Sequence, residues 1–309
     1  MKYYLINILF IALFTFVASC NDDDTITKYE DAVPKTETGA RLVENTNLFA
    51  TIFRDSTYAV TEGALATELH WLSMKGQAMH AFIFEIDLSS PNVSLEVSTP
   101  SNKVAFGMQR MTEQALYEDA SGHSVWGGVN GDFFNTTSGV PQGILYKDGV
   151  AIKTSFQDDI CTYFAITKDG KALVAGQDEF NELKGTFQEA LGGRASLVKD
   201  GIVVSQTNNA VEPRTCIGVS EDGETVYIMV VDGRNFSYSS GMDYSELSQC
   251  MIALGAYDAI NLDGGGSSTF FIRNTPEFID GRFEIRNWPT DNGGAEREVA
   301  NGLLIISNN

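Results

Sequence analysis

The sequence contains few of the residues that build metal centres and nucleic-acid surfaces. It has three histidines and four cysteines in 309 residues, without C-x-x-C spacing, which argues against a zinc site. Lysine and arginine total 21 against 41 aspartates and glutamates, so the formal net charge is −20. Because nucleic-acid phosphates are bound by clusters of basic side chains, we expect no nucleic-acid partner. A small anionic substrate is still compatible with this net negative charge, since arginines close to a site can outweigh negative charges farther away.

The apolar run over residues 6–17 is too short for a comfortable membrane-spanning helix, which needs roughly 20 residues. It follows Lys2 and leads into Ala18-Ser19-Cys20, the pattern of a bacterial lipoprotein signal. We therefore predict a signal peptide over residues 1–19 and lipidation of Cys20; an ordinary signal peptide with an incidental cysteine is the alternative. The expected location is the bacterial envelope, at the outer-membrane surface or in the periplasm, with the membrane as a partner through this lipid.

Residues 20–60 are polar and mixed, and we expect the lipidated cysteine and an acidic, polar tether there. The run Asn21–Asp24 resembles the export tag of surface lipoproteins in Bacteroidetes-like bacteria, or is a solvated tether. Residues 61–309 are long enough for one domain, and 43% hydrophobic residues supply a core. We predict buried thiols at the remaining cysteines and leave a disulfide between two of them open: Cys161, Cys216 and Cys250.

Apolar alternation and short turns predict mostly antiparallel strands. Residues 81–88 and 93–97 alternate with a period of two, and a last strand is expected within 299–306. Asp-Gly pairs favour tight hairpins, and four of them separate apolar runs, at 148–149, 169–170, 200–201 and 222–223.

Two helices complete the prediction. Amphipathic spacing indicates one over residues 108–120 and another over 244–257, with Asp243 as the N-cap of the second. The predicted fold class is therefore α+β: a largely antiparallel or mixed β-sheet with a few packed helices, in a single catalytic domain.

The most informative stretch is Asn261–Ser268, NLDGGGSS. Its glycines let the backbone approach a ligand and expose amide groups, while Asp263 offers a carboxylate. A glycine-rich turn capped by Asp263 is the structural alternative. Two more polar breaks precede it in the chain: NGDFF at Asn130–Phe134 and PRT at Pro213–Thr215.

In this order, the three motifs resemble the phosphodiester glycosidase family, over residues 81–306. The resemblance implies hydrolysis of a sugar-1-phosphodiester, of the GlcNAc-1-phosphodiester kind, to a free sugar and a phosphomonoester. Phosphate is already a weakly basic leaving group, so a strong general acid matters less than in ordinary glycoside hydrolysis. The transition state instead needs compensation of the charge on the departing phosphate.

The candidate site residues follow from this chemistry. Paired carboxylates serve as nucleophile or acid/base, and we rank them Asp263, Asp232, Asp132. The planar fork of arginine suits phosphate, which favours Arg214 over Arg194 and Arg234; a structural salt bridge is the alternative for each. Asn130 is expected to hydrogen-bond sugar hydroxyls or to hold its loop, and Gly265, Gly266 and Ser267 to donate to phosphate or sugar oxygens. Three rings could form a platform for a sugar face, or are ordinary core aromatics: Phe133, Phe134 and Trp126.

No cofactor is required by the sequence, although a divalent cation at Asp232 or Asp263 is compatible with it. The expected partner is a phosphoglycan or another sugar phosphodiester. Two other functions stay open: a non-catalytic glycan-binding surface lipoprotein, and a phosphodiesterase that cleaves the P–O bond and releases sugar phosphate.

Overall fold

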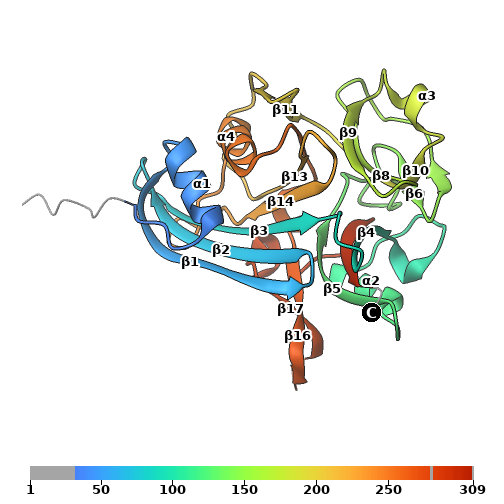
Figure 1. The fold of residues 1–309 in the computed structure, drawn as a ribbon, viewed down its shortest axis with the longest axis horizontal. Helices are drawn as coiled ribbons and strands as arrows, with labels where there is room; N and C mark the ends of the chain where they lie inside the picture. Colours follow the sequence, from blue (N-terminus) through green and yellow to red (C-terminus); the bar gives the residue numbers. More distant parts are fainter. Residues whose placement is uncertain (1–31, 279–280, 308–309) are drawn as a thin grey trace, which may run out of the picture.

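A computed structural model of the chain describes residues 32–278 and 281–307. The predicted signal peptide, Cys20 and the acidic cluster behind it lie outside these residues. The described chain forms three sheets with helices packed against them (Figure 1). None of its helices has the length and apolar character needed to cross a membrane.

The largest sheet has eight strands in the order β1-β2-β3-β14-β13-β15-β11-β12. All of its pairings are antiparallel. Its strands are β1 (Phe49–Thr61), β2 (Ala64–Ser73), β3 (Ala78–Asp87), β14 (Thr225–Val231), β13 (Arg214–Val219), β15 (Asp258–Asn261), β11 (Ser196–Lys199) and β12 (Ile202–Val203).

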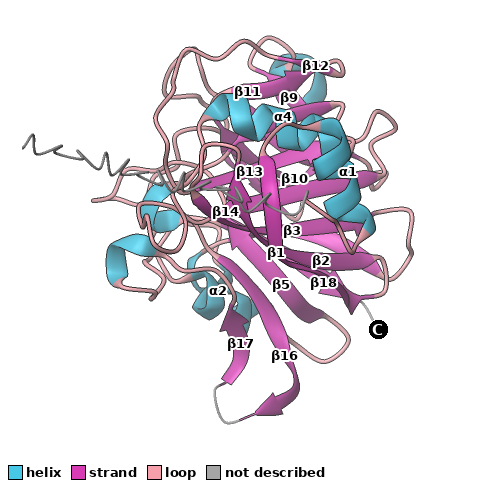
Figure 2. Cartoon of the chain, turned by 90° about the vertical axis from the view of Figure 1, so that its left-hand side faces the viewer, coloured by secondary structure: helices cyan, strands magenta, loops and turns pink. Residues whose placement is uncertain are grey.

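Side-chain alternation gives this sheet two apolar faces. One face, with Ile83 and Met229, packs against Leu42 of α1 (Glu37–Asn45) and Met251 of α4 (Tyr244–Leu254). The other face, with Phe84 and its neighbours, packs against the two smaller sheets. Figure 2 shows both helices over the large sheet. The central strands are thus buried on both sides, and their ends are fixed in position.

The two smaller sheets have five strands each and are antiparallel throughout. Helix α2 (Met111–Glu118) contributes to the core of one, and α3 (Phe180–Leu183) to that of the other. In sheet order the strands are β17 (Gly281–Ile285), β16 (Phe270–Phe278), β5 (Ser124–Asn130), β18 (Gly302–Ser307) and β4 (Val93–Ser98); then β7 (Val150–Lys153), β6 (Leu145–Lys147), β10 (Phe187–Gly193), β8 (Thr162–Thr167) and β9 (Ala172–Gly176).

The predicted α+β class and antiparallel sheets are confirmed, as are the four Asp-Gly hairpins. In the β6–β7 turn, Asp148 and Gly149 both have positive φ, at 52° and 74°. Asp200 and Gly201 repeat this between β11 and β12, at 53° and 71°. Two consecutive positive φ angles define the type I′ turn that joins twisted strands, which explains the preference for Asp-Gly.

The second predicted helix is confirmed as α4, and its N-cap is Asp243. The Asp243 side chain accepts a hydrogen bond from the Glu246 amide at 2.9 Å, and the Glu246 carboxylate accepts one from the Asp243 amide at 3.2 Å. This capping box fixes the start of the helix. The helix ends at Leu254, three residues before the predicted end, and Gly255, with φ at 111°, is its C-cap. The first predicted helix is also shorter than expected, as α2.

The predicted boundary at residue 60 is wrong, because the fold begins earlier. Helix α1 is capped by Thr36, and its Leu42 is fully buried against the large sheet. Strand β1 pairs with β2 along its length, and buried Asp55 accepts the amides of Lys35 and Thr36 at 2.6 and 2.9 Å. Polar composition was misleading here, since an edge strand keeps many polar side chains on its outer surface. The three cysteines of the domain are free and buried, as expected.

Candidate active site

The loops that carry the three sequence motifs meet at Asn130, the last residue of β5. Its side-chain amide donates to the Asp263 carbonyl at 2.7 Å. Its side-chain oxygen accepts the Thr215 hydroxyl at 2.8 Å and the Thr269 amide at 3.0 Å. Asn130 is fully buried, so it joins the loops and does not face a ligand. Of its two expected roles, these contacts favour the one that holds the loop.

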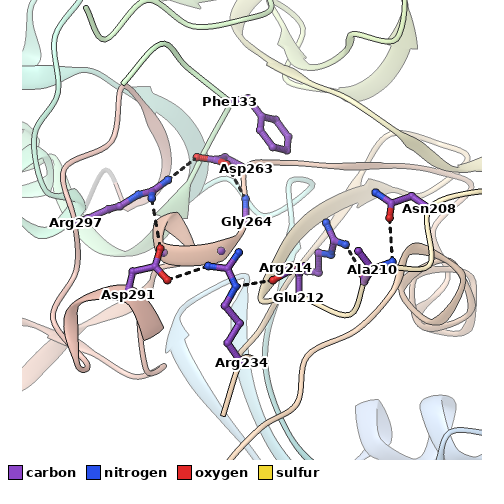
Figure 3. Close-up of a pocket in the computed structure, with 12 residues that line it drawn as sticks. Phe133, Asn208, Ala210, Glu212, Arg214, Arg234, Asp263, Gly264, Asp291 and Arg297 are labelled. Carbon is purple, nitrogen blue, oxygen red and sulfur yellow. Dashed lines mark hydrogen bonds and ion pairs between the residues drawn. The ribbon is translucent and has the colours of Figure 1, made fainter. Parts of the chain in front are cut away.

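These loops surround a cavity of about 410 Å³ (Figure 3). Its volume lies within the range of small-molecule sites. Charged side chains dominate its wall, and three arginines face three carboxylates there. The lining residues are Phe133, Asn208, Ala210, Glu212, Arg214, Arg234, Asp263, Gly264, Gly265, Gly266, Asp291 and Arg297.

Asp263 follows β15, the central strand that pairs with β13. Its amide donates to the Gly131 carbonyl and its Oδ1 accepts the Gly264 amide, both at 2.9 Å. The side chain is almost fully buried, and burial raises its pKa to about 6, against the opposing effects of the Ser267 hydroxyl and Arg297. The group is thus mostly ionised at neutral pH but takes up a proton more readily than an ordinary aspartate. A perturbed carboxyl in a cavity wall is a candidate functional group.

Arg297 is a site residue that the sequence did not reveal. Its Nε and Nη2 donate to the Ser267 hydroxyl at 2.9 and 2.6 Å, and Nη2 lies 3.6 Å from Asp263 Oδ2. Its Nη1 lies 3.7 Å from Asp291 Oδ2. Arg297 stands in an irregular segment before β18, outside any glycine-rich break. No local pattern of residues indicates that this segment returns to Asp263.

The charges on one wall alternate in sign. Arg297 lies between Asp263 and Asp291, and Arg234 joins Asp291 at 2.9 Å to Glu212 at 2.6 Å (Figure 3). Arg234 lines the cavity as predicted, yet two carboxylates neutralise it. This arrangement favours the structural salt bridge for Arg234 over a direct phosphate contact.

Arg214 is different, because none of the described carboxylates forms an ion pair with it. Its Nε donates to the Met242 carbonyl at 3.1 Å and its Nη2 to the Ala210 carbonyl at 2.6 Å. The guanidinium lies 4.3 Å from the Tyr244 ring centroid. Neutral carbonyls and a ring fix this cation without cancelling its charge. Arg214 is thus a fixed, uncompensated cation in the cavity wall, and its phosphate contact stays a prediction.

The glycine run shapes the wall more than it donates hydrogen bonds. The amides of Gly265, Ser267 and Ser268 already donate to carbonyls of the protein, at 2.9, 3.2 and 3.2 Å. Gly265 has φ at 60°, and a Cβ at Gly266 would collide with the Asp291 carboxylate. Gly265 and Gly266 line the cavity, but the fully buried Ser267 instead holds Arg297. The predicted donor role of Gly265 and Ser267 is not supported.

Asp132 and Asp232 lie near the site but outside the cavity wall. Asp132 is buried beneath it, where its Oδ2 accepts the Gly143 amide at 2.6 Å. Burial raises its pKa to about 8, and Asp263 adds to this effect. Asp232 accepts the Asn287 side chain at 3.0 Å and the Trp288 amide at 2.8 Å. Both carboxylates therefore hold loops through these contacts and do not line the cavity, and their catalytic roles stay predictions.

The remaining predicted residues are divided between a neighbouring cavity and the core. Arg194 binds Asp158 at 2.8 Å and the Gln142 side chain, and it lines a second cavity beside the first. Among the three predicted rings, Phe133 lines both cavities. Phe134 and Trp126 pack with core clusters, so a platform of three rings is not formed.

Neither Asp232 nor Asp263 belongs to a group of three or more metal-binding side chains within residues 32–278 and 281–307. One such group in this part of the chain, Glu96, Glu118 and His123, does not line the cavity. The Lys147 ammonium lies 2.6 Å from Glu118 there and supplies a positive charge already. A divalent cation at the candidate site stays a prediction that no contact favours.

Residues 123–306, more than half of the sequence, match the phosphodiester glycosidase family. The chain belongs to this family. The match contains all three motifs that meet at the cavity, and the resemblance inferred from the sequence is thereby confirmed. It establishes a phosphodiester glycosidase domain in general terms and leaves the substrate to be argued from the site.

Similar proteins agree with the family. Human N-acetylglucosamine-1-phosphodiester alpha-N-acetylglucosaminidase is 28% identical over 169 residues, which are 47% of this chain and 32% of the human protein. The prophage-derived uncharacterized protein YomE of Bacillus subtilis is 28% identical over 243 residues, 75% of this chain and 34% of YomE. The chain thus spans about a third of the length of these relatives.

The fold is shared with a solved structure. The catalytic domain of zebrafish N-acetylglucosamine-1-phosphodiester alpha-N-acetylglucosaminidase, auto-inhibited by its pro-peptide, superposes with a TM-score of 0.61 at 19% identity. The comparison covers 92% of this chain and 98% of the zebrafish domain. At this identity the likeness shows a common fold.

Proposed function

We propose that this phosphodiester glycosidase hydrolyses a sugar-1-phosphodiester of the GlcNAc-1-phosphodiester kind at the glycosyl bond, releasing free sugar and a phosphomonoester. The observation that carries the proposal is the opening of Asp263 and Arg214 into one cavity. A sugar-1-phosphodiester presents an anomeric carbon next to an anionic phosphate. A carboxylate for the carbon and an uncompensated cation for the phosphate match these two features.

Asp263 is the lining carboxylate best suited to the anomeric carbon. Glu212 and Asp291 both lie within 3 Å of Arg234 nitrogens, whereas Asp263 is 3.6 Å from Arg297. Asp263 therefore keeps an oxygen for the reaction, either as the nucleophile or as the base for water. The oxygen of the phosphate that leaves is stabilised by Arg214, which needs no reorganisation because its neighbours hold it in place.

Arg297 is a positioning residue in this scheme. It holds the Ser267 hydroxyl and lies beside Asp263, so it keeps the carboxylate ionised and directed at the cavity. Asp132 does not act as a second ionised carboxylate in this scheme. Its pKa of about 8 keeps it mostly protonated at neutral pH.

Hydrolysis of a GlcNAc-1-phosphodiester in oxygen-18 water tests the bond that breaks. We expect the label in the sugar. Label in the phosphate would identify a phosphodiesterase that cleaves the P–O bond, and binding without turnover would identify a glycan-binding protein. Arg214→Ala should reduce the hydrolysis of the phosphodiester more than that of an aryl glycoside; an equal loss would contradict a phosphate contact.

The location is a separate proposal, supported by the sequence alone. We infer that Cys20 carries a lipid that anchors the protein in the bacterial envelope. Metabolic labelling with a radioactive fatty acid, followed by fractionation, tests it. The native chain should be labelled and sediment with membranes, whereas Cys20→Ser should be unlabelled. An unlabelled native chain would contradict the anchor.

A further inference from the structure

A second cavity, of about 520 Å³, adjoins the charged one. Phe133 and Asn208 line both cavities, so the two share a wall. Tyr244 lines the second cavity, and its ring holds the Arg214 guanidinium at 4.3 Å. Arg214 thus stands at the boundary, with the catalytic Asp263 on one side and the second cavity on the other.

The second cavity is chemically unlike the first. Its wall includes Phe133 and Tyr244 together with two aliphatic side chains, Ile160 and Val204. Ile160 is 54% exposed, and Val204 is half-buried. A large aliphatic side chain open to solvent in a concave surface is a common mark of an apolar ligand site.

The one arginine of this second cavity does not make it an anion site. Arg194 is paired with Asp158 at 2.8 Å and donates to the Gln142 side chain. Its guanidinium also lies 5.7 Å from the Phe133 ring centroid, where it supports the shared wall. The cavity therefore offers apolar contact together with uncharged polar side chains, whereas the uncompensated cation, Arg214, lies at its edge. These polar side chains are those of Thr162, Ser196, Gln206, Thr207 and Asn208.

We propose that the second cavity receives the group on the far side of the phosphate, and that this group is apolar: an alkyl chain or an aromatic ring. The inference rests on the proposed function and names the substrate class. A phosphodiester has two substituents. With the phosphate at Arg214 and the sugar at Asp263, the second substituent leaves the phosphate at the boundary of the two cavities. From that position the second substituent enters the adjoining cavity, which shares Phe133 and Asn208 with the first and offers it apolar contact.

Binding of n-alkyl phosphates tests this inference without turnover. These compounds mimic the phosphomonoester product, and each fully buried methylene strengthens binding about 4-fold. We expect octyl phosphate to bind the full chain at least about 10-fold more tightly than butyl phosphate by calorimetry, since part of the chain is buried. Inorganic phosphate should compete with it, because both need Arg214.

Matched serine variants locate the alkyl chain. Ile160→Ser, in the cavity wall, should remove most of the preference for octyl over butyl phosphate. Ile202→Ser is the control, because Ile202 is 70% exposed and lies outside the wall. Equal affinity for the two alkyl phosphates, or a preference untouched by Ile160→Ser, would overturn the assignment. The sugar would be placed in the second cavity instead if Ile160→Ser raised the inhibition constant of free GlcNAc while octyl and butyl phosphate bound equally.

Hydrolysis separates this inference from the proposed function. GlcNAc-1-phosphate esters of butanol and octanol should both be cleaved, with a lower KM for the octyl ester. If both are cleaved with equal KM, the second cavity does not bind the apolar group, and the proposed function stands. If neither is cleaved but octyl phosphate is still preferred, the proposed function fails while the cavity keeps its assigned ligand.

Discussion

Asp263→Asn should abolish activity and stabilise the fold. Burial raises the pKa of Asp263 to about 6, whereas in an unfolded chain it is about 4. Because the folded value is the higher one, ionisation of Asp263 opposes folding. This cost is absent below about pH 4 and complete above about pH 6. Asparagine cannot ionise and keeps an oxygen for the Gly264 amide. The substitution removes the cost and retains the contact.

The size of the effect follows from the two pKa values. A difference of about two units corresponds to about 2.7 kcal/mol, and we expect a gain of about 1–3 kcal/mol in the free energy of unfolding at pH 8. At pH 4 most of the gain should be lost, since Asp263 is then protonated in the folded state and only about half ionised in the unfolded one. Loss of the reacting carboxylate should lower kcat/KM by at least about 10²–10⁴-fold, the usual contribution of such a group.

Urea unfolding at pH 4 and pH 8, with hydrolysis of a GlcNAc-1-phosphodiester, measures both effects. Asp222→Asn is a suitable control, because a hydrogen bond from Ser220 lowers the pKa of that exposed aspartate. It should not be stabilised at pH 8. A loss of stability in Asp263→Asn at both pH values would refute the raised pKa. Activity within about 10-fold of the native enzyme would refute the catalytic role.

Three further substitutions test the supporting residues. Arg297→Gln removes the cation beside Asp263 and should move the acidic limb of the kcat/KM profile upward by about one pH unit; an unchanged limb would contradict the coupling. Asn130→Ala leaves three buried groups without their hydrogen bonds and should lower the free energy of unfolding, measured with urea, by about 3 kcal/mol. A negligible change would show that the loops are held together without Asn130. Asp132→Asn replaces a carboxyl with a pKa of about 8, so activity at pH 7 should stay within about 3-fold of the native value. As pH rises from about 4 to 8, the free energy of unfolding should fall less in this variant than in the native protein. Loss of activity would support a catalytic role for Asp132.

The sequence predicted those parts of the fold that depend on neighbouring residues. The Asp-Gly hairpins and the Asp243 cap are set by local backbone preferences, so they are visible in a few residues of sequence. Helix α1 and strand β1 were misjudged for the opposite reason. Their stability comes from β2 and the face of the large sheet, which are contacts that composition does not reveal.

The candidate site was predicted in part. Asp263 and Arg214 stand in glycine- and proline-marked breaks after or before apolar strands, and both face the cavity. Asn130 occupies a similar break, but its burial depends on how three loops pack together. Arg297 could not be found from a local pattern, because only the pairing of β18 with β5 brings its segment to Asp263. Asp232 does not line the cavity, which could not be foreseen because a strand end does not tell which way a carboxylate points.

The place of β18 in its sheet ties activity to the order of synthesis. This strand lies between β5 and β4, although the chain makes it some 170 residues after β5 and only just after Arg297. A growing polypeptide therefore leaves two strand edges open and lacks the arginine beside Asp263 until residues 297–307 have emerged. A chain that ended before residue 297 would therefore lack both the arginine beside Asp263 and the strand that joins β5 to β4.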